Sequence, residues 1–100
     1  MSLTVALMWE ARATAGRGDE LLEWARSQVL AHEPVHREVL RAPQDRVLVI
    51  TWWHAPALSA DLPELPEPAA DLITRPVHRW RFESVEGAAG GTLRGTVGKP

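Results

Sequence analysis

The chain has 100 residues, 45% of them hydrophobic, and a formal net charge of −2. This length allows one domain with a modest core, and the absence of cysteine excludes disulfides, thiolate nucleophiles and thiolate metal ligands. The charge balance and the scattered arginines argue against nucleic acid or an anionic membrane as partner. No apolar run is long enough to span a bilayer, and the first residues do not resemble a signal peptide, so we expect a cytoplasmic protein.

The first predicted element is a strand over residues 3–12. Side chains in a strand alternate between two faces, and both faces are apolar here, since Trp9 lies on one and Met8 on the other. A helix follows the turn at residues 16–18 and has acidic residues in its first turn, where they suit the helix dipole. Pro34 prevents the helix from continuing. Helical spacing predicts that its buried stripe consists of Leu21, Leu22, Ala25 and Val29.

A β-hairpin is predicted next, from strands over residues 35–42 and 46–54. The segment Ala42-Pro43-Gln44-Asp45 is typical of a type I turn, with proline at the position whose backbone angle it presets. The second of these strands is again apolar on both faces, because Trp53 lies on one and Trp52 on the other.

A proline-rich stretch follows the hairpin, and within it only residues 67–73 favour a helix, of about two turns. A fourth strand is predicted over residues 76–85. Residues 86–100 contain five of the seven glycines, so we expect a flexible C-terminal tail. The alternative is that Thr92-Leu93-Arg94 pairs with an edge of the sheet as a short extra strand.

The resulting order, βαββαβ, is that of the ferredoxin-like α+β fold, in which one face of a four-stranded antiparallel sheet packs against two helices. The first and third strands are central in this topology, and the second and fourth are edges. The charges agree, since the predicted edge strands carry several Arg and Glu residues, which discourage unwanted pairing. We therefore expect one ferredoxin-like domain over residues 1–85.

The apolar character of both sheet faces predicts a homodimer. Two helices cover only one face, so a tryptophan and two branched aliphatic residues of the third strand remain on the other. Burial of one tryptophan removes about 150–250 Å² from water, and a large exposed apolar patch is an aggregation hazard. We expect two copies to pack sheet to sheet and form a barrel-like core.

Two segments of the chain resemble a known family. Residues 8–13, Met-Trp-Glu-Ala-Arg-Ala, followed by residues 15–22, are similar to the opening of antibiotic-biosynthesis-monooxygenase-like proteins of the dimeric α+β barrel superfamily. Residues 75–83 resemble the closing strand of a short bacterial group within it. The resemblance covers most of residues 3–85 and implies a homodimer with a pocket between helices and sheet. It implies no single activity, since the superfamily includes cofactor-free oxygenases, haem-degrading oxygenases and isomerases.

The candidate catalytic residues are His78 and His54, because histidine exchanges protons near neutral pH. His78 lies on a strand face with two aromatic residues, and His54 lies at a strand end beside a loop, where ligands often bind. The alternative is that both are structural histidines at the margin of the core or in solvent. The aromatic residues predicted to line a substrate pocket are Trp9, Trp24, Trp52, Trp80 and Phe82.

Three functions remain open from the sequence. The first is a cofactor-independent monooxygenase, in which His78 or His54 takes a proton from an apolar or aromatic substrate and the resulting carbanion reacts with oxygen. The second is a non-catalytic homodimer that binds an apolar ligand or supports a partner, which the absence of Asn, Tyr and Cys favours. The third is haem binding through one of these histidines. We expect no metal site, because the histidines lack recognised ligand spacing, and no cofactor under the first two hypotheses.

Overall fold

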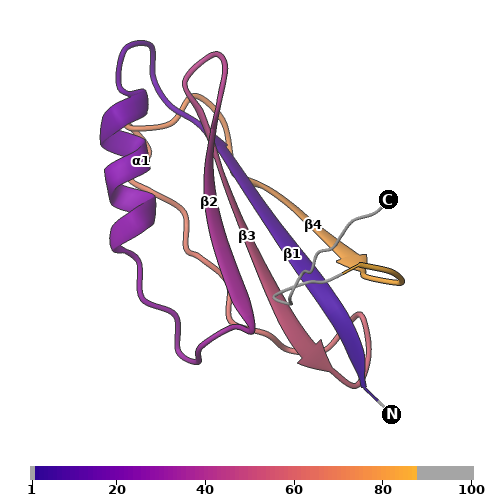
Figure 1. Ribbon diagram of the computed structural model, residues 1–100. Helices are drawn as coiled ribbons and strands as arrows, with labels where there is room; N and C mark the ends of the chain where they lie inside the picture. The colour runs from indigo at the N-terminus through magenta and orange to yellow at the C-terminus, as the bar shows by residue number, and fades with distance from the viewer. Residues whose placement is uncertain (1, 88–100) are drawn as a thin grey trace.

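The computed structural model describes residues 2–87, which form a four-stranded antiparallel sheet with one helix against one of its faces (Figure 1). The strand order is β2-β3-β1-β4, which confirms that the first and third strands are central. None of the helical structure in these residues is long and apolar enough to cross a membrane. The elements are β1 (Leu3–Arg12), α1 (Gly18–Ser27), β2 (His36–Ala42), β3 (Arg46–Ala55) and β4 (His78–Glu83).

Strand pairing assigns each side chain to one of two faces. Trp9 of β1 is paired with Val49 of β3 and with Arg79 of β4, so these three residues share a face, which packs against α1 and is called here the covered face. The opposite side is called the open face. Its residues are Thr4, Ala6, Met8, Glu10, Arg12, His36, Glu38, Leu40, Ala42, Arg46, Leu48, Ile50, Trp52, His54, His78, Trp80 and Phe82.

The buried core lies on the covered face. Leu21 and Ala25 of α1 are fully buried against Val47 and Val49 of β3. The prediction for Val29 was wrong: this residue lies beyond the end of α1, and it is 93% exposed. The buried stripe of the helix is therefore shorter than its sequence pattern suggests.

A side chain of β2 holds the C-terminal end of α1. The guanidinium of Arg37 donates through Nη2 to the carbonyl of Ala25 and through Nη1 to that of Gln28, both at 2.8 Å. The last carbonyls of a helix lack partners within the helix, and a cation is favourable beside them. These hydrogen bonds therefore explain how the charged side chain of Arg37 is accommodated on the covered face of β2.

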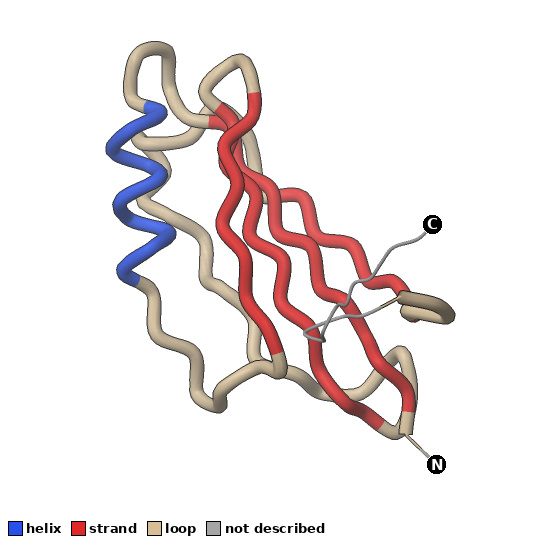
Figure 2. Tube along the Cα trace, in the orientation of Figure 1, coloured by secondary structure: helices blue, strands red, loops and turns tan. Residues whose placement is uncertain are grey.

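The second predicted helix, over residues 67–73, is absent from the described residues. We call residues 56–77 the proline-rich segment; it crosses the covered face without a helix and has turns at 58–59 and 70–72 (Figure 2). Leu65 and Leu72 are buried against the sheet by this chain path, and the carbonyls of Leu65 and Pro66 accept from the side chains of Arg79 and Trp9. The described order is thus βαβββ rather than βαββαβ, with extended chain in the place of the second helix.

The tip of the β2–β3 hairpin also differs from prediction. Gln44 has φ = 67° and Asp45 has φ = 58°, whereas a type I turn over residues 42–45 requires a negative φ at its second central residue. Asp45 is fixed by contacts with the loop after β1. Its carbonyl accepts from the N–H of Ala13 at 2.8 Å, and its carboxylate accepts from the N–H of Gly16 at 3.2 Å. A long-range contact therefore sets this turn.

The last strand is shorter than the predicted span of residues 76–85, because β4 extends only from His78 to Glu83. Beyond it, Val85 is exposed. The alternative strand at Thr92-Leu93-Arg94 and most of the glycine-rich tail expected over residues 86–100 lie outside the described residues.

Candidate functional site

A cavity of about 310 Å³ opens between the sheet and the proline-rich segment. This volume is within the range of small-molecule binding sites, which are mostly apolar with a few polar groups. Met8 and Trp80 also border the cavity. Its apolar lining on the covered side consists of Leu7, Trp9, Val49 and Leu65. The polar residues that line it are Thr51, Glu64, Arg79 and Arg81.

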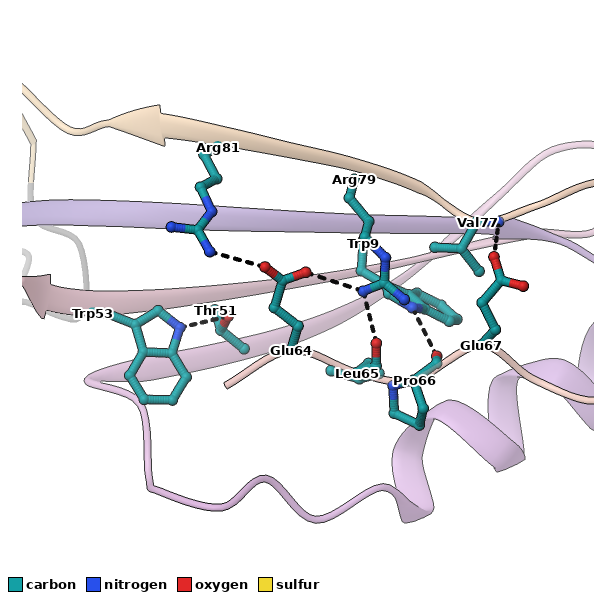
Figure 3. A network of polar contacts seen from close by, with 10 residues as sticks. All are labelled: Trp9, Thr51, Trp53, Glu64, Leu65, Pro66, Glu67, Val77, Arg79 and Arg81. Atoms are coloured by element: carbon teal, nitrogen blue, oxygen red, sulfur yellow. Dashed lines mark hydrogen bonds and ion pairs between the residues drawn. The ribbon is translucent and has the colours of Figure 1, made fainter. Parts of the chain in front are cut away.

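The carboxylate of Glu64 lies between two guanidinium groups at this cavity (Figure 3). Arg79 donates through Nη1 to Oε1 of Glu64 at 3.2 Å, and Arg81 donates through Nη2 to Oε2 at 2.9 Å. Both arginines project from the covered face of β4, where they are paired with Trp9 and Leu7 of β1. Two guanidinium groups and one carboxylate leave one net positive charge on the polar wall of the cavity.

The same two arginines attach the proline-rich segment to the sheet. Arg79 donates through Nη1 to the carbonyl of Leu65 at 2.7 Å. Arg81 donates through Nη1 to the carbonyls of Leu58 at 2.9 Å and Ala60 at 2.6 Å. Extended chain outside a sheet needs other partners for its carbonyl groups, and β4 supplies them as side chains. The cover of the cavity is therefore held by charged groups that also line it.

Trp9 and Thr51 line the cavity from the sheet. The indole N–H of Trp9 donates to the carbonyl of Pro66 at 3.2 Å (Figure 3), and its ring stacks on Trp24 with 5.8 Å between ring centroids. The hydroxyl of Thr51 accepts a hydrogen bond from the indole of Trp53 at 2.8 Å. Neighbouring residues thus fix the orientation of both side chains.

A second polar cluster surrounds Glu10, a buried residue on the open face near the end of the sheet. Its carboxylate accepts from Arg75 at 2.9 Å and Arg46 at 3.3 Å, and Nδ1 of His78 lies 3.3 Å away. Burial alone would raise the pKa of Glu10, but hydrogen bonds and charge from Arg75, then Arg46 and His78, lower it on balance. Within residues 2–87, the buried Nη1 of Arg75 makes no hydrogen bond. The cluster attaches the chain before β4 to the sheet.

The structure divides the predicted site residues between the two faces. Trp9 and Trp24 stack on the covered side. Trp80 borders the cavity, although its position in β4 places it on the open face. Neither predicted catalytic histidine, His54 or His78, lines the cavity. The predicted residues assigned to the open face are Trp52, His54, His78, Trp80 and Phe82.

Histidine and tryptophan form pairs on the open face. The ring centroids of His36 and Trp52 are 5.0 Å apart, and those of His78 and Trp80 are 5.4 Å apart with an edge-to-face geometry. His54 is exposed at the end of β3. Across the described part of the chain, no three side chains of the metal-binding types gather into a site.

The charged residues of the cavity were not among the predicted site residues. Alternation along β4 places Arg79 and Arg81 on one face of the strand and His78 on the other. This was the only feature of the sequence that indicated a shared position for the two arginines. Their partner Glu64 lies in a stretch without regular periodicity, so nothing local indicates that it faces them.

No protein-family model, curated protein sequence or solved structure matches this chain. The resemblance of residues 8–13, 15–22 and 75–83 to monooxygenase-like proteins therefore stays a prediction. A function must be argued from the geometry of the cavity and of the two sheet faces.

Proposed function

We propose that the protein binds a small, largely apolar molecule in the cavity between the sheet and the proline-rich segment. The observation that carries this proposal is the cavity of about 310 Å³, with an apolar floor and charged groups on one wall. Small-molecule sites have this composition, in which the apolar surface supplies affinity and a few polar groups fix orientation. The proline-rich segment forms the cover of the site.

Binding without catalysis is the better-supported form of this proposal. A general base must come within hydrogen-bond distance of the proton that it removes, and neither His54 nor His78 lines the cavity. The one carboxylate in its lining, Glu64, already accepts hydrogen bonds from two arginines. These positions favour a ligand-binding or accessory protein over a monooxygenase that uses histidine as its base.

We also propose that two copies pack open face against open face, as expected for a member of the dimeric α+β barrel superfamily. Trp80 and Phe82 on this face are 45% and 49% exposed in the single chain. The helix and the proline-rich segment both lie on the other side of the sheet (Figure 1). Large exposed apolar side chains on one face are typical of protein interfaces, and an isologous pair of sheets would cover this face in both copies at once.

The ligand proposal is tested by narrowing the cavity. Leu65 and Leu72 are both buried leucines of the proline-rich segment, but only Leu65 lines the cavity. With 2-naphthol as a neutral apolar probe, we expect Leu65→Phe to weaken binding about tenfold, or 1.4 kcal/mol, and Leu72→Phe to have little effect. Equal weakening by both variants, or no binding to the unmodified protein, would contradict the proposal.

The dimer proposal is tested by placing a charge on the open face. We expect Trp80→Glu to yield monomers, because a carboxylate buried between two apolar sheets would lack a partner. Val29→Glu is the matched control, since Val29 is also an exposed apolar residue but lies outside the open face. Light scattering measures both masses. A Trp80→Glu variant with the mass of the unmodified protein would rule out this interface.

A further inference from the structure

We infer that the ligand of this cavity is a small carboxylate with an aromatic or alkyl body, and that it displaces Glu64 from Arg79 and Arg81. This inference rests on the proposed ligand-binding function and specifies the class of ligand. Glu64 would then occupy the ligand's anionic position in the empty protein, and binding would exchange one carboxylate for another.

The geometry of β4 supports a carboxylate. Arg79 and Arg81 are two positions apart on one strand, so both side chains leave the same face, and both line the cavity. Their terminal nitrogens contact separate oxygens of the same carboxylate, at 3.2 Å and 2.9 Å. Guanidinium groups bind planar carboxylates well because their N–H donors match the spacing of the two oxygens. A site that already holds one carboxylate is suited to hold another.

The contacts of Glu64 suggest that it can be displaced. Each arginine gives it a single hydrogen bond rather than a parallel pair, and all three side chains are partly exposed. Ion pairs of this kind contribute little to stability. Both arginines would keep their bonds to the carbonyls of Leu58, Ala60 and Leu65, so the cover would stay attached when Glu64 leaves.

An incoming carboxylate would gain contacts that Glu64 lacks. Its apolar body would fill the space beside Leu7, Trp9 and Val49, while its charge would replace that of Glu64 on the arginines. Since the polar wall carries a net positive charge, an anion is preferred over a neutral molecule of the same shape. A neutral amide would leave Glu64 in place and gain only the apolar contacts.

The test compares 2-naphthoate with 2-naphthamide by isothermal titration calorimetry of the full chain. We expect the acid to bind at least about tenfold more tightly than the amide, and Glu64→Gln to increase the affinity for the acid several-fold while that for the amide changes little. Glu67→Gln is the control. It removes the same charge from the same segment, but Glu67 contacts the N–H of Val77 and not the arginines. Circular dichroism confirms that each variant is folded.

Each other outcome overturns a defined part of the inference. If acid and amide bind equally well, the ligand is not a carboxylate, although the proposed binding function stands. If Glu64→Gln leaves the affinity for the acid unchanged or weakens it, Glu64 only fastens the cover and is not displaced. If neither compound binds, the proposed function fails for ligands of this size, and the inference fails with it.

Discussion

The two faces of the sheet are similar in sequence pattern but differ in how they are covered. On the covered face, Val5 and Val49 are almost fully buried by residues of the same chain. On the open face, Trp80 and Phe82 remain nearly half exposed. A strand whose side chains are apolar on both faces is typical of a sheet that is covered on both sides. The described part of this chain covers one side only.

The charged residues of the two faces also serve different purposes. On the covered face, Arg37 and Arg81 donate to backbone carbonyls and so fasten α1 and the proline-rich segment to the sheet. On the open face, Glu10 gathers Arg46 and Arg75 at one end of the sheet. The two central strands are uncharged between these residues and His54, and Glu38 adds a carboxylate only on the edge strand β2.

The largest expected effect comes from removing core volume on the covered face. Leu21 is fully buried, so we expect Leu21→Ala to lower the free energy of unfolding by about 2–5 kcal/mol.

Leu40 on the open face is 36% exposed in the single chain. We expect the effect of Leu40→Ala to grow with protein concentration, since the proposed dimer would gain stability by mass action. Urea unfolding at two concentrations measures both, and a Leu40→Ala effect independent of concentration would argue against a covered open face.

The next effect concerns the cluster around Glu10. Glutamine keeps one acceptor oxygen but loses the charge and the second oxygen that pair with Arg75 and Arg46, so Glu10→Gln should lower the free energy of unfolding by about 1–3 kcal/mol at neutral pH. Because the folded state lowers the pKa of Glu10 from its usual 4.5, its stabilising contribution is complete above that value and is lost as the pH falls through the folded pKa.

Urea unfolding between pH 7 and pH 3 tests the role of Glu10. The variant should lose less stability on acidification than the unmodified protein. Glu23→Gln, at an exposed helix position, is the control and should retain the full acid dependence. Parallel pH curves for Glu10→Gln and the unmodified protein would show that Glu10 does not contribute this dependence.

A smaller effect is expected where the hairpin tip meets α1. A Cβ atom on Gly18 would lie 2.6 Å from Oδ1 of Asp45. Alanine is the better helix former, yet we expect Gly18→Ala to destabilise the protein by about 1 kcal/mol because this contact is too short. An Asp45→Gly background removes the 2.6 Å contact and leaves the Cα of residue 45 at 3.3 Å from the new Cβ, so the loss measured by thermal unfolding should shrink. Stabilisation by Gly18→Ala alone would contradict this packing.

The smallest effect is expected at His54, which is exposed on the open face near the end of β3. His54→Ala should change the free energy of unfolding by less than about 0.5 kcal/mol and leave the affinity for 2-naphthoate unchanged. Calorimetry measures the affinity. A marked loss of binding would move the site to the open face and restore the hypothesis of histidine-based chemistry.

The strands were predictable because their signal is local. The apolar alternation of residues 3–12 coincides with β1, and the concentration of charge on the second and fourth strands identified the edges correctly. The turn at residues 42–45 was not predictable, because contacts of Asp45 with Ala13 and Gly16 set its conformation. Local turn preferences carry no information about a partner some thirty residues away.

The predictions of the second helix and of the site residues were wrong for related reasons. Residues 67–73 were predicted to form a helix, but the burial of Leu65 and Leu72 against the sheet is achieved without one. Glu64 meets Arg79 and Arg81 only because the segment follows this path. His54 was selected for its chemistry and for its position at a strand end. Alternation assigns it to one face of its strand, but the sequence did not show which face meets the helix, and His54 lies on the open one.

The most direct test of the difference between the two faces is the mass of the full chain in solution at low micromolar concentration. If a second copy covers the open face, light scattering should give about twice the 11.1 kDa of a single chain. A mass of one chain under these conditions would mean that the apolar open face exists without a partner copy, and the proposed assembly would be wrong.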